Sequence, residues 1–396
     1  MQQAQDTSTN LNARTYQPIE DYAIIGDLHT VALVGKHGSI DWCCIPRFDS
    51  PSVFGALIDV NKGGYFQIAP SFDQTTSVGR RQLYLPETNV LVTRFLTNDG
   101  VGEITDFMPI KETGSAPHQH HIIRAVSVVR GSLPFEMVCK PAFNYGRDPH
   151  TVSLSDEGAI FHSQSLCLGL ASTVPLQEDG EGGVRATFTL HEKEQVYFVL
   201  ESARDHDIRP QRISRRQYQA TYEKTLTYWQ NWLSQCQYQG RWREMVQRSA
   251  LALKLLTYAP TGAIVAAPTT SLPETLGGAR NWDYRYTWLR DAAFTIYSLL
   301  ILGFTQEAEA FMGWLDARCH ELKDNGSLQP MYTIDGGHDL QESTLDHLEG
   351  YRKSSPVRIG NGAYKQKQLD VYGELMDSIY ILSLIHISEP TRQAEI

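Results

Sequence analysis

A short segment in the second half of the chain, residues 277–291, gathers the kinds of side chain that bind sugars. Its sequence is GGARNWDYRYTWLRD, which combines guanidinium, carboxylate, amide and indole groups. Carboxylates and arginine side chains bind the hydroxyls of a pyranose through charge-assisted hydrogen bonds, and an indole covers the apolar C–H face of the ring. We interpret the segment as part of a sugar-binding site. The alternative is the charged start of a helix whose tryptophans belong to the core.

Three charged residues of this segment, Asp283, Arg290 and Asp291, are the first candidates to contact a substrate. If the segment is helical, they share one face, because residues seven or eight positions apart lie two turns apart on the same side of a helix. A helix here therefore predicts that the three side chains converge.

Three motifs, in the same order along the chain, resemble bacterial members of glycoside hydrolase family 15. They are residues 266–291, the sequence PVRIGN at 356–361 and the sequence QLDVYGE at 368–374. This family contains glucoamylases, glucodextranases and trehalases. The resemblance implies an inverting, exo-acting hydrolase of an α-glucoside such as trehalose, isomaltose or a malto-oligosaccharide.

The N-terminal part of the chain carries a second resemblance. The sequences PIEDY at 18–22 and GSIDW at 38–42 are similar to the trehalase-like β domain of the same proteins. Together the two resemblances cover roughly residues 16–380.

The resemblance also implies which residues hold the substrate. Trp288, Arg290 and Asp291 match the family's Trp-x-Arg-Asp motif, which binds the non-reducing glucose in the deepest subsite. A second wall of the pocket is implied for residues further along the chain. With Asp283 from the composition of the segment, the predicted substrate-binding residues are Asp283, Trp288, Arg290, Asp291, Arg358, Gln368 and Asp370.

Inverting hydrolysis of a glycoside uses two carboxyl groups about 6.5–9.5 Å apart, one as general acid and one as general base. In the family the acid lies in a Trp-Glu segment after the motif at 368–374, and the base lies further on, so we expect neither in this sequence. We therefore expect the chain as given to be inactive. Glu342 and Glu374 are alternative catalytic carboxylates, but helix pairing and capping account for them at least as well. No cofactor is implied, because acid–base hydrolysis of an acetal needs none.

Two other functions fit the sequence. The first is a non-catalytic sugar-binding or interaction module that uses the same pocket without hydrolysis. The second is an inverting phosphorylase with a related helical barrel. A phosphorylase needs a phosphate site, and no glycine-rich anion-binding loop stands out in the sequence.

The end of the sequence, residues 382–396, does not fit the family. The sequence LSLIHISEPTR at 382–392 resembles the translation of a sequencing adapter. We therefore expect this tail to be foreign to the protein, and the native sequence to stop near residue 381, within a domain. The alternative is a genuine polar tail.

Composition argues against several kinds of partner. The 396-residue chain has a formal net charge of −10, whereas nucleic acids and anionic membrane surfaces attract basic patches. The sequence begins without a basic and then apolar leader, and no apolar run reaches membrane-spanning length, so we expect a cytoplasmic protein. The sequence indicates no oligomeric state.

Neither the cysteines nor the histidines suggest a metal centre. The six cysteines are scattered without C-x-x-C spacing, which disfavours zinc sites and disulfide frameworks and favours a role in core packing. His118, His120 and His121 form a cluster, but it has no partner carboxylate nearby in the sequence. We therefore expect no metal there.

Residues 16–205 have the pattern of an antiparallel β-sandwich. Short apolar runs such as 31–34 and 90–96 are separated by turn residues. Hairpin turns are also expected at 130–132 and 156–158.

The pattern then changes from strands to helices. Apolar residues at three- and four-residue steps between 214 and 233 predict an amphipathic helix, which we assign to a linker over 206–240. The resemblance implies that residues 241–381 form the first part of an (α/α)6 barrel, and that residues 1–15 are a flexible N-terminus. Further helices are expected over 242–260, 284–302, 305–322 and 364–380, joined by long glycine-rich loops.

Two expectations concern how the parts meet. Asp27 and Asp41, with their neighbours Gly26 and Trp42, lie in a region that either reaches over the barrel mouth or serves only packing. In a partial barrel, apolar residues of the inner helix faces are expected to lack packing partners. These residues are Trp282, Phe294, Leu299, Phe311 and Trp314.

Overall fold

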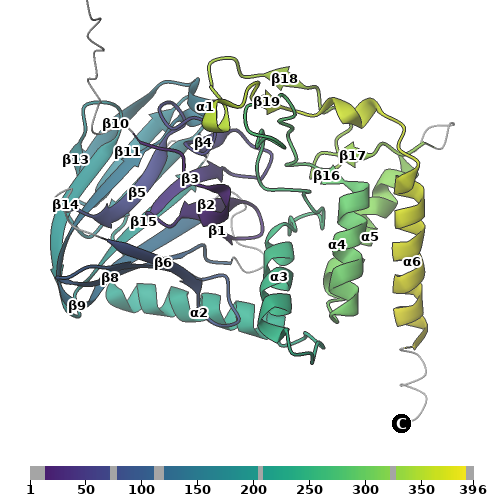
Figure 1. Cartoon of the computed structure of the whole chain (residues 1–396), viewed down its shortest axis with the longest axis horizontal. Coiled ribbons are helices and arrows are strands. Elements are labelled where there is room, and N and C mark those ends of the chain that lie inside the picture. The colour runs from purple at the N-terminus through teal and green to yellow at the C-terminus, as the bar shows by residue number, and fades with distance from the viewer. Residues whose placement is uncertain (1–13, 72–77, 111–119, 204–207, 322–326, 389–396) are drawn as a thin grey trace, which may run out of the picture.

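The structure is a computed structural model that describes residues 14–71, 78–110, 120–203, 208–321 and 327–388. Figure 1 shows strands on one side of the molecule and a group of helices on the other, with long loops crossing between them along one edge. We call residues 14–203 the β region and residues 243–388 the helical region. No helix in the described ranges is long and apolar enough to cross a membrane.

Among the described residues of the β region, fifteen strands form one antiparallel sheet, which confirms the predicted antiparallel β structure. The strands are β1 (Tyr22–Gly26), β2 (Val31–Gly35), β3 (Ser39–Cys44), β4 (Ser52–Phe54), β5 (Tyr65–Pro70), β6 (Gly79–Tyr84), β7 (Leu91–Leu96), β8 (Gly100–Phe107), β9 (His120–Lys140), β10 (His150–Ser155), β11 (Gly158–Ser163), β12 (Cys167–Ser172), β13 (Gln177–Glu178), β14 (Val184–His191) and β15 (Gln195–Ala203). Two short helices, η1 (Ile19–Asp21) and α1 (Phe143–Gly146), flank them.

Strand β9 joins the two layers of this sheet. Its first half pairs with β8 and β15, and its second half pairs with β5 and β14. The hairpin turn predicted at 130–132 is therefore wrong, because the chain continues there as one strand. The strand requires a glycine at position 131 because of its conformation and close packing. Gly131 has a φ of 81°, and a Cβ atom there would lie 2.0 Å from the carbonyl oxygen of Asp99. The turn predicted at 156–158 is confirmed between β10 and β11.

The core of the β region lies between the two layers. Phe66 and Phe135 from one layer share a single apolar cluster with Phe95 and Phe198 from the other. None of the six cysteines, all of which lie in the described residues, forms a disulfide bond. Four of them (Cys43, Cys44, Cys139 and Cys167) are buried, as expected for packing residues. A fully buried ion pair, Arg124 Nε to Asp106 Oδ1 at 2.8 Å, crosses strands β8 and β9 within this core.

The main helices lie where the sequence predicts them, with shifted ends. They are α2 (Arg215–Leu233), α3 (Arg243–Leu255), α4 (Leu289–Ile301), α5 (Gln306–His320) and α6 (Asp370–Ser388). Helix α2 begins with a capping box between Ser214 and Gln217. Helix α6 includes residues 382–388 of the segment that resembles an adapter; residues 389–396 lie outside the described residues.

Helix α4 begins five residues later than predicted. Residues Thr287–Trp288 form the short strand β16, which pairs with β17 (Met331–Tyr332). This pairing keeps the preceding residues extended, so the helix starts only at Leu289. Helix α6 likewise starts after a separate turn, η3 (Gly362–Lys365).

The helices pack on one another and on the β region. Trp232 at the end of α2 stacks on Phe304 with ring centres 4.1 Å apart, and Leu28 and Val31 from β1–β2 join the same apolar cluster. Three residues that were expected to lack partners, Leu299, Phe311 and Trp314, are buried in this cluster. That expectation is wrong for them: Trp314, for example, packs on Phe311 of its own helix and edge-on against Tyr332 of β17. Phe294 is 51% exposed, as expected.

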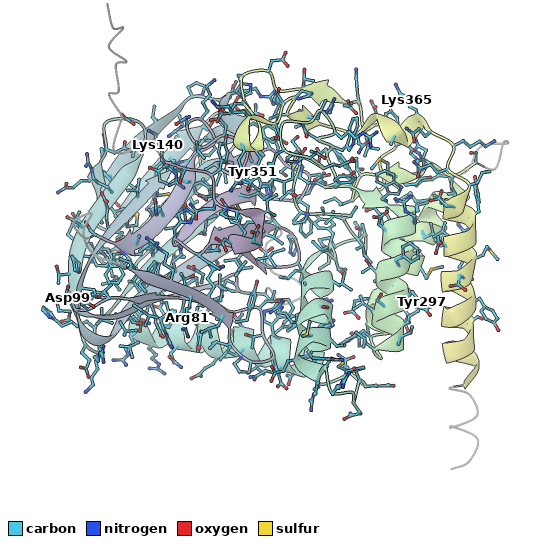
Figure 2. The ribbon with its side chains drawn as sticks, viewed as in Figure 1. Arg81, Asp99, Lys140, Tyr297, Tyr351 and Lys365 are labelled. Carbon is cyan, nitrogen blue, oxygen red and sulfur yellow. The ribbon has the colours of Figure 1, made fainter. Side chains whose placement is uncertain are left out.

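Loops of the helical region contact the β region along the edge where the two parts meet. In Figure 2, Tyr351 lies at this junction. It belongs to the short helix η2 (Tyr351–Lys353); its hydroxyl donates to the carbonyl of Gln17 at 2.8 Å, and its ring packs edge-on against Tyr16. Nearby, strand β18 (Ser343–Thr344) pairs with β19 (Arg358–Ile359), and the indole of Trp42 donates to the carbonyl of Pro268 at 2.8 Å.

Candidate sugar-binding site

Five of the seven predicted substrate-binding residues converge on one partly exposed surface. Trp288 ends strand β16, and Arg290 and Asp291 lie in the first turn of α4. Gln368 lies in the loop that leads into α6, and Asp370 is the first residue of that helix. The antiparallel pairing of β16 and the packing of α6 beside α4 bring these segments together (Figure 1).

The contacts within this group are direct. The indole Nε1 of Trp288 donates to Gln368 Oε1 at 3.0 Å. The guanidinium of Arg290 donates to Asp370 Oδ2 at 2.9 Å and to Asp291 Oδ2 at 3.2 Å. It also lies 5.1 Å from the centre of the Trp288 ring. We call these five residues the α4–α6 cluster.

Arg290 is the charged centre of the α4–α6 cluster. Partial burial lowers the pKa of its guanidinium, but the hydrogen bond to Asp370 and the charge of Asp291 raise the pKa by more, so it lies above the usual value. Its two carboxylate partners remain about two-fifths exposed, at 40% for Asp291 and 41% for Asp370. A row of charged, outward-facing hydrogen-bonding groups beside an indole suits a polyhydroxylated ligand.

Tyr284 belongs to the same surface, although sequence reasoning missed it. Its ring stacks on Trp288 with centres 6.0 Å apart and planes at 27°. Burial, followed by the charges of Glu274 and Asp291, raises the pKa of its phenol, which favours the protonated hydroxyl. The signal in the sequence was its position four residues before Trp288, which the assumed helix would have placed on a shared face.

Asp283 is separate from the α4–α6 cluster. The prediction that it shares a helix face with Arg290 and Asp291 is wrong, because the chain is extended before Leu289. Its carboxylate is fully buried and forms a two-pronged ion pair with Arg285, at 2.9 Å to Nε and 2.7 Å to Nη2. Arg285 was not predicted as a site residue, because nothing local in the sequence signals its burial.

Arg358 forms a second group with residues from other loops. Its guanidinium contacts Glu342 Oε1 at 3.0 Å, donates to the carbonyl of Ala279 at 2.8 Å and lies 4.4 Å from the ring centre of Trp282. Glu342 precedes strand β18 and is not helical. The sequence-based explanation of this residue by helix pairing therefore does not apply. Glu374 lies within α6.

Comparison with known proteins agrees with these motifs. Residues 240–394 match the family model of glycosyl hydrolases family 15, and residues 6–229 match that of the trehalase-like N-terminal domain. The chain therefore carries a trehalase-like N-terminal domain and a glycosyl hydrolases family 15 domain.

Two relatives illustrate the similarity of this chain to known proteins. A trehalase of Thermoplasma volcanium is 39% identical over 378 residues, which cover 95% of this chain and 59% of that protein. A trehalase of Mycolicibacterium smegmatis is 36% identical over 397 residues, covering 92% and 57% respectively. The chain thus spans less than two thirds of the length of these relatives.

The fold also resembles a solved structure. A bacterial glucoamylase complexed with acarbose matches with a TM-score of 0.57 at 12% identity, covering 82% of this chain and 53% of that one. At this identity the match concerns the fold.

In this chain, the N-terminal acidic residues serve packing. Asp27 is buried and bonded to His120 Nδ1 at 2.5 Å. Asp41 is buried and accepts from Arg14 at 2.7 Å and from Tyr22 at 2.7 Å. Both carboxylates are therefore engaged in internal contacts, whereas the neighbouring Trp42 contacts the helical region at the carbonyl of Pro268. The contact of Arg14 also shows that the expected flexible N-terminus of 1–15 does not extend to this residue.

His120, which belongs to the histidine cluster of the sequence, contacts a buried carboxylate. His118 lies outside the described residues, and His120 is engaged by Asp27. Among the ranges that the structure covers, no group of three or more His, Cys, Asp or Glu residues is arranged to hold a metal ion.

Asp41 gives a testable pH dependence. Burial alone raises the pKa of its carboxyl, but the hydrogen bond from His37 and the charge of Arg14 lower it by more, to about 2. Because the folded pKa lies below the unfolded one, the stabilisation is present above about pH 4 and is lost as the pH falls toward 2. We expect Asp41→Asn to lower the free energy of unfolding by about 2 kcal/mol at pH 7.

Urea unfolding at several pH values tests this expectation. The difference between wild type and Asp41→Asn should hold from about pH 7 to pH 5 and narrow below about pH 4. The exposed-turn variant Asp99→Asn is the control and should show little difference throughout. If the stability difference between wild type and Asp41→Asn did not change with pH, the lowered pKa assigned to Asp41 would be wrong.

Proposed function

We propose that the protein hydrolyses an α-glucoside by removing its non-reducing glucose with inversion, and that the α4–α6 cluster binds that glucose. The observation that carries this proposal is the convergence of Trp288, Arg290, Asp291, Gln368 and Asp370 from two distant segments. The family 15 domain supports it. We propose trehalose as the substrate, because relatives at 36–40% identity are named trehalases.

The cluster offers the groups that a glucose ring requires. The fork of Arg290 and the carboxylates of Asp291 and Asp370 provide donors and acceptors for ring hydroxyls. The stacked rings of Tyr284 and Trp288 provide an apolar surface for the C–H face. Glu342 and Arg358 lie in the neighbouring loops, where we propose that they line the second wall of the site.

We further propose that helices α3–α6 belong to an (α/α)6 barrel. The fold match to a bacterial glucoamylase supports this architecture. In such a barrel the site lies where the loops between helices gather, and the described site residues do lie at the loop ends of α4 and α6 (Figure 1).

We assign neither the general acid nor the general base to a described residue. Asp291 and Asp370 are ion-paired with Arg290, and Glu342 is ion-paired with Arg358. Carboxylates held by an arginine are suited to accept hydrogen bonds from sugar hydroxyls, which is the role we propose for them. The catalytic pair is proposed to come from sequence that follows the motif at 368–374 in the family.

A direct experiment on the purified 396-residue chain follows. We expect the chain to bind trehalose in calorimetric titration and to release no glucose in a coupled assay. The rate of hydrolysis falls by about 10²–10⁴-fold for each catalytic group that is absent. Enzyme-dependent glucose release would contradict the assignment and direct attention to Glu342. Failure to bind trehalose would contradict the binding role of the cluster.

A non-catalytic sugar-binding module predicts the same binding. Sequencing the gene beyond codon 381 separates the two functions. The hydrolase requires a continuing reading frame that encodes a Trp-Glu segment and a later glutamate, whereas a binding module does not.

A further inference from the structure

A buried ion pair lies at the junction of the β region and the helical region. The side chains of Arg285 and Asp283 are 1% and 0% exposed, and two parallel hydrogen bonds join them. This geometry is the strongest form of an arginine–carboxylate pair, because both charges and directions are matched.

One side of the pair is held by the β region. Arg285 Nη1 donates to the carbonyl of Ser50 at 2.8 Å and lies 3.4 Å from the Cys44 sulfur. Its guanidinium also lies 5.6 Å from the ring centre of Tyr145 and 6.0 Å from that of Trp42. The orientation of Arg285 is therefore set by residues that are distant in the sequence.

The other side of the pair holds the loop that carries half of the candidate site. The amide of Gly360 donates to Asp283 Oδ2 at 3.2 Å, and Asn361 Nδ2 donates to the Asp283 carbonyl at 3.0 Å. The side chain of Asn361 in turn accepts from the amide of Ala363 and so caps η3, which leads toward Gln368 and Asp370. Arg358 lies two residues before Gly360.

Asp283 thus stands between the two halves of the site. Along its own segment, five to eight residues later, lie Trp288, Arg290 and Asp291. Across its hydrogen bonds lie the residues from Arg358 to Asp370. A shift of its carboxylate would move one half relative to the other.

Energetics favour a positional role for the pair over a stabilising one. Removing two charges from water costs about as much as their attraction returns, so well-packed apolar replacements of a buried pair are often neutral in stability. Apolar side chains, however, cannot accept the amide hydrogen of Gly360 or direct the loop.

We propose that Asp283 and Arg285 are positioning residues through which the β region sets the loop 358–370 against the first turn of α4, and so fixes the spacing of the sugar-binding groups. This inference rests on the proposed function for its link to sugar, while the positioning itself is measurable without a ligand. It also gives the trehalase-like N-terminal domain a direct part in the site.

The test uses the full chain with the double variant Asp283→Leu/Arg285→Met, which removes both charges together. Amide hydrogen exchange is followed over residues 356–364, and trehalose binding is measured by calorimetry. We expect the unfolding midpoint to stay close to that of wild type. We also expect exchange in the loop to accelerate about tenfold or more, and trehalose affinity to fall by about the same factor.

A matched control comes from the core of the β region. The pair Arg124–Asp106 is equally buried, and within the described ranges its other hydrogen bonds go to the carbonyls of Phe66 and Gly38. The double variant Arg124→Met/Asp106→Leu should leave loop exchange and trehalose affinity unchanged. Should Asp283→Leu/Arg285→Met fail to fold, Arg285→Lys keeps the charge but loses the two-pronged geometry, and it should accelerate loop exchange in the same way.

The exchange and binding measurements test the positioning of the loop, its link to sugar binding and the proposed function separately. Unchanged exchange over residues 356–364 in the Asp283–Arg285 variants overturns the positioning inference, whatever happens to sugar binding. If exchange is faster but trehalose affinity is undiminished, the link between the position of the loop and sugar binding is overturned. If the wild-type chain does not bind trehalose, the proposed function is overturned. In that case hydrogen exchange in the loop still tests whether Asp283 and Arg285 position it.

Discussion

Replacing Arg290 with alanine is expected to weaken trehalose binding by roughly 10- to 100-fold, because a hydrogen bond to a charged group contributes about 1.5–3 kcal/mol. The loss has two parts. The guanidinium group that would bind ring hydroxyls is removed, and the carboxylates of Asp291 and Asp370 lose the cation that pairs with both of them. Calorimetric titration of the purified variant measures the effect.

The fold should survive this change. The Arg290 side chain is 35% exposed, and surface ion pairs contribute only about 0–1 kcal/mol to stability. Arg280→Ala is the matched control, because Arg280 lies in the same segment, is 78% exposed and pairs with Glu274 at 3.4 Å. Equal trehalose affinity in Arg290→Ala and Arg280→Ala would show that the α4–α6 cluster does not bind the sugar.

Replacing Glu307 with alanine is expected to lower the free energy of unfolding by about 3–5 kcal/mol. Glu307 Oε1 accepts from the Trp232 indole and from Lys254 Nζ, each at 2.7 Å, and so ties α5 to α2 and α3. The side chains of Glu307 and Lys254 are 4% and 13% exposed. Truncation would leave a buried ammonium without its partner.

Urea unfolding of the variant tests this prediction. Glu223→Ala, on the exposed face of α2, is the control and should change stability by no more than about 0.5 kcal/mol. Glu307→Gln should be intermediate, because an amide oxygen still accepts from Trp232 but carries no charge. A loss below about 1 kcal/mol for Glu307→Ala would mean that the ion pair is not what joins these helices.

Local patterns in the sequence predicted most of the helices. The spacing of apolar residues identified α2 and α3. Such signals lie within one or two turns of the residues they describe. The start of α4 was missed because it depends on strand β17, more than forty residues later in the chain.

The candidate site divides in the same way. Trp288, Arg290 and Asp291 were predicted by their motif, and the structure places Gln368 and Asp370 beside them. The burial of Asp283 was not predictable, because it follows from the contact of Arg285 with Ser50, 235 positions away in the sequence. A charged residue in a polar motif has the same appearance in sequence whether it faces a ligand or a buried partner.

The shared strand β9 constrains any attempt to divide or rearrange this protein. Because the two layers are hydrogen-bonded to successive halves of one strand, neither layer is a separable building block. Gly131 has the sequence signature of a permissive loop, yet an insertion, a reporter or a new terminus there would interrupt both layers at once. An insertion in the turn at 156–158, between the neighbouring strands β10 and β11, would by contrast leave the pairing of β9 intact.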